Sequence, residues 1–269
     1  MSLKSKLWFI YRWLIWIKDN ILDNPDINSE INSFSIWKTV LWNDIKCYKF
    51  WKWEEKILYF GWIHGNEVWT VKLMNKWVNC IFEDAQIQNK QLFVIPCLNI
   101  DWYERALKNP DYFNGWTIWK TNSNNVDLNR NFPTINWSAK SQLFVAWKYS
   151  DISWWESAWS EPEIKALLEL ISKEDIKTIY TFHNCWWTVF SLNADKKVLE
   201  YSKKSNYKIF TKQSWETELI PEQKTWHSME WGPENNIEII EIELKTRYWS
   251  EWKQNKSALI NSLSIKNND

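Results

Sequence analysis

Histidine is rare in this chain, and two of its three histidines follow stretches that are typical of buried strands. His64 comes after the apolar run 57–60 and lies three residues before Glu67, so both side chains can bind one metal ion. His183 ends a second apolar run, whereas His227 is most simply a loop residue, so His183 is the better candidate for a third ligand. Two histidines and one carboxylate suit a catalytic zinc ion, which keeps its fourth position open. The His-x-x-Glu spacing also occurs by chance, so the assignment depends on the neighbouring segments.

Four segments support the assignment: residues 61–67 (Gly-Trp-Ile-His-Gly-Asn-Glu), 125–133 (Asn-Val-Asp-Leu-Asn-Arg-Asn-Phe-Pro), 182–185 (Phe-His-Asn-Cys) and 242–244 (Ile-Glu-Leu). Two more are residues 99–102 (Asn-Ile-Asp-Trp) and 160–163 (Ser-Glu-Pro-Glu). The first four resemble the zinc metallocarboxypeptidases and occur in the same order as in that family, and the other two resemble its amidase branch. The likeness is closest to the bacterial murein-peptide amidases, and it extends from about residue 36 to about residue 250. The resemblance predicts an α/β fold: a single domain with a twisted mixed central sheet, helices on both faces and the site at the strand ends.

The resemblance implies that His64, Glu67 and His183 hold one Zn²⁺ ion. Asp127 resembles the family carboxylate that accepts a hydrogen bond from the other ring nitrogen of the first histidine ligand and so fixes its tautomer. The alternative for Asp127 is a residue that only closes an Asx turn.

Glu243 resembles the general base of the family, a glutamate followed by leucine near the end of the last central strand. Alternation along the predicted strand 237–244 places Glu241 on the same face, so Glu241 is the rival. We favour Glu243 because the Glu-Leu pair continues the resemblance. The alternative for both residues is an exposed position on an edge strand.

Asn129 and Arg130 resemble the pair that binds the terminal carboxylate of the substrate. A planar guanidinium can bind a carboxylate through two hydrogen bonds, although an ordinary surface arginine is the alternative. Lys120 stands where the amidase branch has an arginine that is thought to stabilise the oxyanion. The lysine keeps the charge but not the forked donor. Residues 228–233 lack the tyrosine that digestive-type members carry before the base, which suits the amidase branch.

The predicted function is zinc-dependent hydrolysis of an amide bond beside a free carboxylate, with a peptide or a murein peptide as substrate. One alternative is an N-acyl amino acid deacylase like the succinylglutamate desuccinylase and aspartoacylase group, which shares the His-Gly-Asn-Glu and Asp-Leu-Asn-Arg segments. The amidase segments disfavour it. Another alternative is a catalytically inactive peptide-binding module, which the retention of the three ligands and Glu243 disfavours.

Composition places limits on the domain organisation and on the partners. A length of 269 residues suits one large α/β domain, which we assign to residues 36–269 after an N-terminal segment and linker at 1–35. Lys plus Arg and Asp plus Glu both number 33, so no overall field favours nucleic acid or an anionic membrane. The apolar stretch 7–17 is too short to span a bilayer and precedes no small-residue cleavage site. We therefore expect no membrane span and a cytoplasmic location.

The balance of tryptophan and glycine is abnormal, with 25 tryptophans and 4 glycines. Average glycine usage of about 7% would give roughly 19 glycines here. Our hypothesis is that most of the tryptophans are UGA codons, which some bacteria translate as glycine. Trp77 and Trp231 should be genuine, and a tryptophan-rich binding surface is the alternative. The resemblance calls for glycine at Trp62, Trp102, Trp159, Trp186 and Trp187.

Hydrophobic periodicity predicts the elements that carry the candidate residues. We expect strands at 45–50 and 57–60 to be neighbours joined by a turn at 52–55. Ser160 is expected to cap a helix, with Glu163 completing a capping box. The other expected elements are helices at 68–82, 195–205 and 257–265 and strands at 91–98, 178–182 and 237–244.

Overall fold

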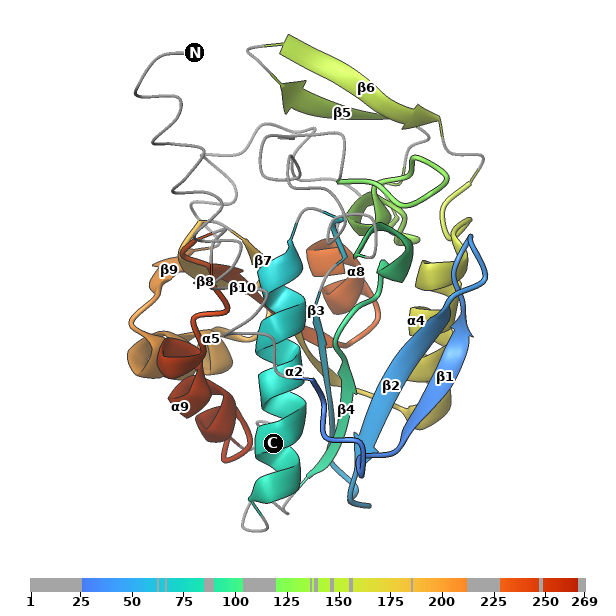
Figure 1. Cartoon of the computed structure of the whole chain (residues 1–269). Coiled ribbons are helices and arrows are strands. Elements are labelled where there is room, and N and C mark those ends of the chain that lie inside the picture. The colour runs from blue at the N-terminus through green and yellow to red at the C-terminus, as the bar shows by residue number, and fades with distance from the viewer. Residues whose placement is uncertain are drawn as a thin grey trace, which may run out of the picture.

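An eight-stranded mixed sheet forms the centre of the molecule in the computed structural model (Figure 1). The strand order is β1-β2-β4-β3-β7-β10-β8-β9. The four strands β4, β3, β7 and β10 are parallel to one another, β1 and β2 add antiparallel pairs at one side, and β8 pairs antiparallel to β10. The strands are β1 Ser33–Lys38, β2 Asp44–Phe50, β3 Lys56–Gly61, β4 Gln91–Ile95, β7 Thr178–Asn184, β8 Thr188–Phe190, β9 Lys208–Phe210 and β10 Glu238–Leu244. The structure describes residues 26–61, 63–65, 67–84, 90–103, 120–135, 137, 140–145, 148–154, 157–184, 186–211, 228–246 and 249–265.

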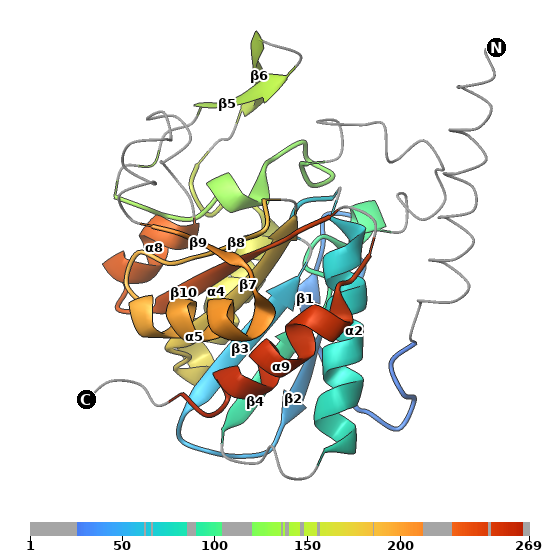
Figure 2. The same cartoon turned by 90° about the vertical axis from the view of Figure 1, so that its left-hand side faces the viewer.

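Helices cover both faces of this sheet, as the two views in Figures 1 and 2 show. The helices are α2 Val68–Glu83, α4 Pro162–Glu174, α5 Asp195–Ser205, α8 Ser228–Glu234 and α9 Trp252–Ser262. Side chains from α2, α5 and α9 share one hydrophobic cluster with Tyr59 and Tyr180, whereas α4 and α8 share a second cluster with Leu58 and Ile179. Because neighbouring residues of one strand contribute to different clusters, the sheet separates two cores. The predicted fold class is confirmed.

A separate two-stranded antiparallel hairpin is formed by β5 Lys140–Val145 and β6 Lys148–Trp154. The helices of the described ranges include no segment with the length and apolar character needed to cross a membrane.

The central parallel strands bring the candidate residues together. Parallel strands that are buried on both faces are almost continuously apolar, and all five residues of β4 are buried. Their carboxyl ends meet at one edge of the sheet, which is where sites form in such folds. Gly61 ends β3 at a point where a Cβ atom would lie 3.0 Å from the carbonyl oxygens of Pro96 and Thr70. This close approach requires glycine and directs the chain toward His64.

Two predictions about local structure were wrong. β2 and β3 are not neighbours, because β4 lies between them and pairs with both. Ser160 does not cap α4: the N-cap residue is Glu161, and no side chain caps the helix. The hydroxyl of Ser160 instead accepts a hydrogen bond from the amide of Asn131 at 3.0 Å, and Glu163 accepts one from the backbone N–H of Val40 at 3.4 Å. The polar side chains at the start of α4 therefore hold distant segments rather than their own helix.

Some element boundaries also differ from the sequence predictions. The closing helix α9 begins at Trp252 instead of residue 257, and the strand expected at 91–98 ends at Ile95. The first strand begins at Ser33, within the segment that we assigned to the linker. The backbone of Asn28 already bonds the side chain of Asn79 on α2. Residues 1–25, with the apolar stretch 7–17, lie outside the described residues.

Tryptophan occupies several backbone positions that favour glycine. Among the described residues, Trp42, Trp51, Trp159 and Trp187 have φ between 56° and 64°, which is uncommon for a bulky side chain. Trp77 instead packs fully buried in the middle of α2. The recoding of these residues stays a prediction.

Candidate metal centre and active site

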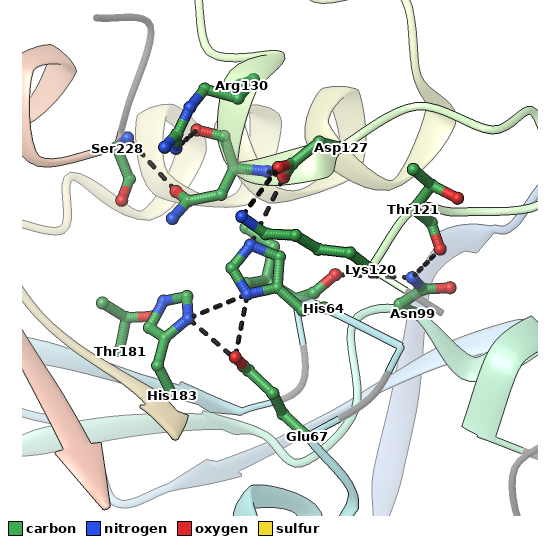
Figure 3. Close-up of polar contacts among 12 residues, drawn as sticks. His64, Glu67, Asn99, Lys120, Thr121, Asp127, Arg130, Thr181, His183 and Ser228 are labelled. Carbon is green, nitrogen blue, oxygen red and sulfur yellow. Dashed lines mark hydrogen bonds and ion pairs between the residues drawn. The ribbon is translucent and has the colours of Figure 1, made fainter. Parts of the chain in front are cut away.

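His64, Glu67 and His183 converge at the carboxyl ends of two neighbouring parallel strands (Figure 3). His64 lies just after β3. His183 is the next-to-last residue of β7, and the preceding Phe182 pairs with Gly61 of β3. Glu67 is the N-cap residue of α2, so the start of the helix fixes its position. All three side chains are buried, although their polar atoms are costly to remove from water unless they find a partner.

The distances among the three residues suit one small cation. His64 Nδ1 lies 2.9 Å from Glu67 Oε1 and 3.3 Å from His183 Nδ1, and His183 Nδ1 lies 3.2 Å from Glu67 Oε2. Ligand atoms bound at about 2.0–2.2 Å to a tetrahedral zinc ion lie roughly 3.3–3.6 Å apart. The candidate ligands therefore need only small movements to share a zinc ion.

The charges at this point also suit a cation. Burial raises the pKa of Glu67, but the adjacent His64 and His183 lower it to about 2. Burial lowers the pKa of His183, but the carboxylates of Glu67 and Glu241 raise it to about 9. Two imidazole nitrogens that face each other need a proton or a cation between them, and the ionised Glu67 adds to that demand. The donor set thus fits a divalent metal ion.

Asp127 contacts the ring nitrogen of His64 that faces away from Glu67. Its Oδ1 lies 3.3 Å from His64 Nε2 and also accepts a hydrogen bond from the backbone of Asn129 at 3.0 Å. The second bond closes the short 3₁₀ helix η3, Leu128–Arg130. Asp127 therefore makes both contacts that the sequence suggested as alternatives. Burial raises its pKa, but Lys120 and His64 lower it well below the usual range.

Lys120 lies beside Asp127. Its Nζ is 3.2 Å from Asp127 Oδ2, and its side chain is partly exposed. Asn99, which follows β4, donates hydrogen bonds to the carbonyl oxygens of Thr121 at 3.1 Å and Ile63 at 3.4 Å. It thereby ties the segment after Lys120 to the segment that carries His64. The resemblance included Asn99 in the segment 99–102 but assigned no role to its side chain.

Arg130 lies above the metal ligands in the view of Figure 3. Asn129 is buried, and its side-chain oxygen accepts a hydrogen bond from the backbone of Ser228, the first residue of α8, at 3.4 Å. Arg130 is partly exposed, and its Nη1 donates to the carbonyl oxygen of Asn129 at 3.4 Å. A hydrogen bond of this length is weak, so the guanidinium can turn toward a carboxylate.

The two glutamates of β10 lie on the same face as His183. Glu243 pairs with His183, and Glu241 pairs with Thr181. Glu241 Oε2 is 3.7 Å from His183 Nε2, beyond hydrogen-bond distance. Oε2 of Glu243 is also buried without a hydrogen bond among the described residues. Burial and the nearby Glu67 raise the pKa of Glu243 to about 8, against the lowering effect of His183. His227 lies outside the described residues.

The sequence of residues 31–240 matches that of a protein family described as zinc carboxypeptidase. Chicken carboxypeptidase Z is 31% identical over 126 residues, which make up 41% of this chain and 19% of that protein. The matched part thus spans about a fifth of the curated relative.

Solved structures with much lower identity share the fold. The murein-tripeptide amidase MpaA of Escherichia coli O157 superimposes with a TM-score of 0.69 and 17% identity, over 93% of this chain and 97% of that chain. An aspartoacylase family protein of Mesorhizobium loti gives a TM-score of 0.58 and 14% identity, over 91% of this chain and 71% of that chain. The fold alone therefore does not separate the amidase from the deacylase.

Proposed function

Because the chain belongs to the zinc carboxypeptidase family, we propose that it hydrolyses an amide bond beside a free carboxylate in a zinc-dependent reaction. The observation that carries this proposal is the convergence of His64, Glu67 and His183, with Asp127 on the outer nitrogen of His64. A metal ion held there would polarise the scissile carbonyl and lower the pKa of a bound water.

The other residues supply proton transfer and binding. Glu243 is the proposed base, which takes a proton from the attacking water and gives it to the leaving amine. Its raised pKa suits both steps, because such a carboxyl can hold the proton between them. Arg130 and Asn129 are proposed to bind the substrate carboxylate, and Lys120 to stabilise negative charge on the carbonyl oxygen.

We propose a murein peptide as the substrate. The support is the likeness to the murein-tripeptide amidase along nearly the whole of that chain, together with the segments 99–102 and 160–163. Both segments contribute to the site in this structure. Asn99 connects the loops that carry His64 and Lys120, and Glu161 binds Asn122 and Asn124 of the loop that leads to Asp127.

A deacylase of the aspartoacylase type is the second candidate, because its fold also matches this chain. The test is to assay the purified protein on a murein tripeptide, on ordinary peptides and on N-acyl amino acids. We expect hydrolysis of the murein tripeptide, loss of activity after chelation and its return with zinc. Preference for an N-acyl amino acid would establish the deacylase. Binding without hydrolysis of any of these would establish an inactive module.

We also propose that the catalytic domain extends to residue 269 and begins with β1 at Ser33, three residues before the predicted boundary at residue 36. The proposed partner is the peptide substrate, without nucleic acid. The cytoplasmic location stays a prediction, which fractionation of the source cells with a specific antibody would test.

A further inference from the structure

Both histidine ligands have a carboxylate near the ring nitrogen that faces away from the other ligands. For His64 the carboxylate is Asp127, at 3.3 Å from Nε2. For His183 it is Glu241, at 3.7 Å from Nε2. We propose that Glu241 is a positioning residue for His183, which orients the imidazole and strengthens its bond to the metal. This inference rests on the metal site of the proposed function.

The strand pairing gives Glu241 a fixed position. In the parallel pair β7 and β10, Thr181 is opposite Glu241 and His183 is opposite Glu243. Strand alternation places these four side chains on one face of the sheet. His183 is buried, and the side chain of Glu241 is only 12% exposed. Side chains on two hydrogen-bonded strands are held more rigidly than side chains on loops, which suits an orienting role.

The chemistry of the ring explains the effect of the carboxylate. Since Nδ1 of His183 faces His64 and Glu67, the proton of the neutral ring belongs on Nε2 when a metal binds. Thr181 Oγ1 lies 3.3 Å from Nε2 and can accept this proton in a hydrogen bond. Glu241 is beyond hydrogen-bond distance and acts through its negative charge. That charge makes the imidazole a better donor to the cation, as outer carboxylates do for histidine ligands in general.

The two glutamates of β10 then have different roles. Glu241 lies toward the outer nitrogen of His183, so its carboxylate faces the side of the ring that does not bind metal. Glu243 is two residues closer to the carboxyl end of β10, and substrate arrives at that end of the strands in such sheets. The rival base thus becomes a support for a ligand.

Competition with a chromophoric chelator measures the zinc dissociation constant and tests this inference. We expect Glu241→Gln to weaken zinc binding about 10- to 100-fold, the usual result of removing an outer partner. Asp127→Asn is the matched positive control and should weaken binding similarly. Glu243→Gln should bind zinc with unchanged affinity. Glu241→Asp keeps the charge and should recover part of the affinity that the glutamine variant loses.

The possible outcomes separate the inference from the proposed function. If the unaltered protein does not bind zinc, the proposed function fails. If it binds zinc and Glu241→Gln binds equally well, the positioning role is overturned while the function stands. Loss of turnover at saturating zinc with a normal dissociation constant would make Glu241 the base and also overturn the inference. Thermal unfolding of the metal-free variants shows whether each variant is folded. If the glutamine variant does not fold, a Glu241→Asp variant with wild-type zinc affinity supports the role, and one no tighter than Asp127→Asn opposes it.

Discussion

The two histidine ligands belong to halves of the site that are built differently. The His183 half consists of β7 and β10, whose backbone pairing places Thr181, Glu241 and Glu243 around the ring. The His64 half consists of the segment after β3 and the loop 120–131, which has no strand of its own. Both halves present a carboxylate to the outer ring nitrogen. The comparison shows that the same local chemistry can be held by a hydrogen-bonded sheet or by buried polar side chains.

Buried polar side chains replace the strand ladder in the His64 half. The amide of Asn122 donates to Glu161 at 2.7 Å and to Glu163 at 3.2 Å, and the amide of Asn124 donates to Glu161 at 2.9 Å. Asn131 is bonded to the backbone of Glu161 at 3.1 Å. The loop is therefore tied to the start of α4 at several points. Each of these bonds is expensive to break, because its partner would be left buried without a hydrogen bond.

The largest functional effect is expected from a substitution in the His183 half. We expect Glu243→Gln to lower turnover by about 10²–10⁴-fold, the usual contribution of a general base. Zinc binding should persist, because the substitution keeps the shape of the side chain and Glu243 is not one of the candidate metal ligands. Single-turnover kinetics with zinc content measured on the same sample tests this. Normal turnover would return the role of base to Glu241.

The His183 half could be predicted from the sequence better than the His64 half, and the reason is physical. Period-two alternation and apolar runs mark strands, so His183 at a strand end and the shared face of Glu241 and Glu243 were predictable. Alternation cannot tell which glutamate lies near His183 Nε2, because that depends on the register with another strand. The insertion of β4 between β2 and β3 was missed for the same reason.

Polar contacts between distant segments leave no periodic signal. The motif around residues 125–133 suggested Asp127 as a partner of His64, but the anchors that hold its loop were not visible. Ser160 and Glu163 were interpreted as local helix caps because their spacing is that of a capping box. In the structure Ser160 bonds Asn131 and Glu163 bonds Asn122 instead. Local rules fail where a side chain satisfies a segment far away in the sequence.

The stability of the His64 half should depend on pH through Glu163 of α4, which is bonded to Asn122 of the loop. Burial raises the pKa of this carboxyl to about 7, so the folded state disfavours its ionised form. The stability that depends on the protonated group is fully present below the unfolded pKa, near 4.5, and is lost as pH rises through 7. The loss amounts to roughly 3 kcal/mol at most, at about 1.4 kcal/mol per pKa unit.

Denaturant unfolding between pH 4 and pH 8 measures this loss. In Glu163→Gln the free energy of unfolding should change less across that range than in the unaltered protein. The partly exposed Glu200, which bonds only Lys203 of its own helix in the described contacts, offers a control in Glu200→Gln. An identical pH dependence for Glu163→Gln and the unaltered protein would contradict the assignment.

Substitution of Lys120 tests whether the His64 half acts on the substrate or only on His64. Removal of its charge in Lys120→Ala should lower turnover by about 10²–10³-fold and change the Michaelis constant less, if the lysine stabilises the oxyanion. If it only holds Asp127, to which its Nζ is bound at 3.2 Å, zinc affinity should fall instead. Steady-state kinetics at saturating zinc, together with the zinc dissociation constant, separates the two roles. Lys120→Arg should retain most of the turnover in the first case.

The smallest expected effect concerns the backbone of the turn between β1 and β2, which bonds Glu163 of α4 through the backbone of Val40. Trp42 lies in the turn between β1 and β2, has φ of 64° and is 79% exposed. A left-handed conformation costs a residue with a side chain roughly 1–2 kcal/mol, and glycine avoids that cost at some expense in chain entropy. Since the indole buries little surface, we expect Trp42→Gly to raise the free energy of unfolding by about 1 kcal/mol. Trp77→Gly, in the core of α2, should destabilise the protein severely.

The same pair of positions tests the recoding hypothesis in the source organism. Mass spectrometry of the protein purified from its own cells should find a peptide with residue 42 lighter by the difference between tryptophan and glycine. The peptide with residue 77 should keep the mass of tryptophan. Intact tryptophan at position 42, combined with no stabilisation in Trp42→Gly, would show that the turn tolerates the bulky residue and that the codon is read as written. Glycine at position 42 would instead explain why a left-handed turn occurs there, since glycine adopts that conformation without steric cost.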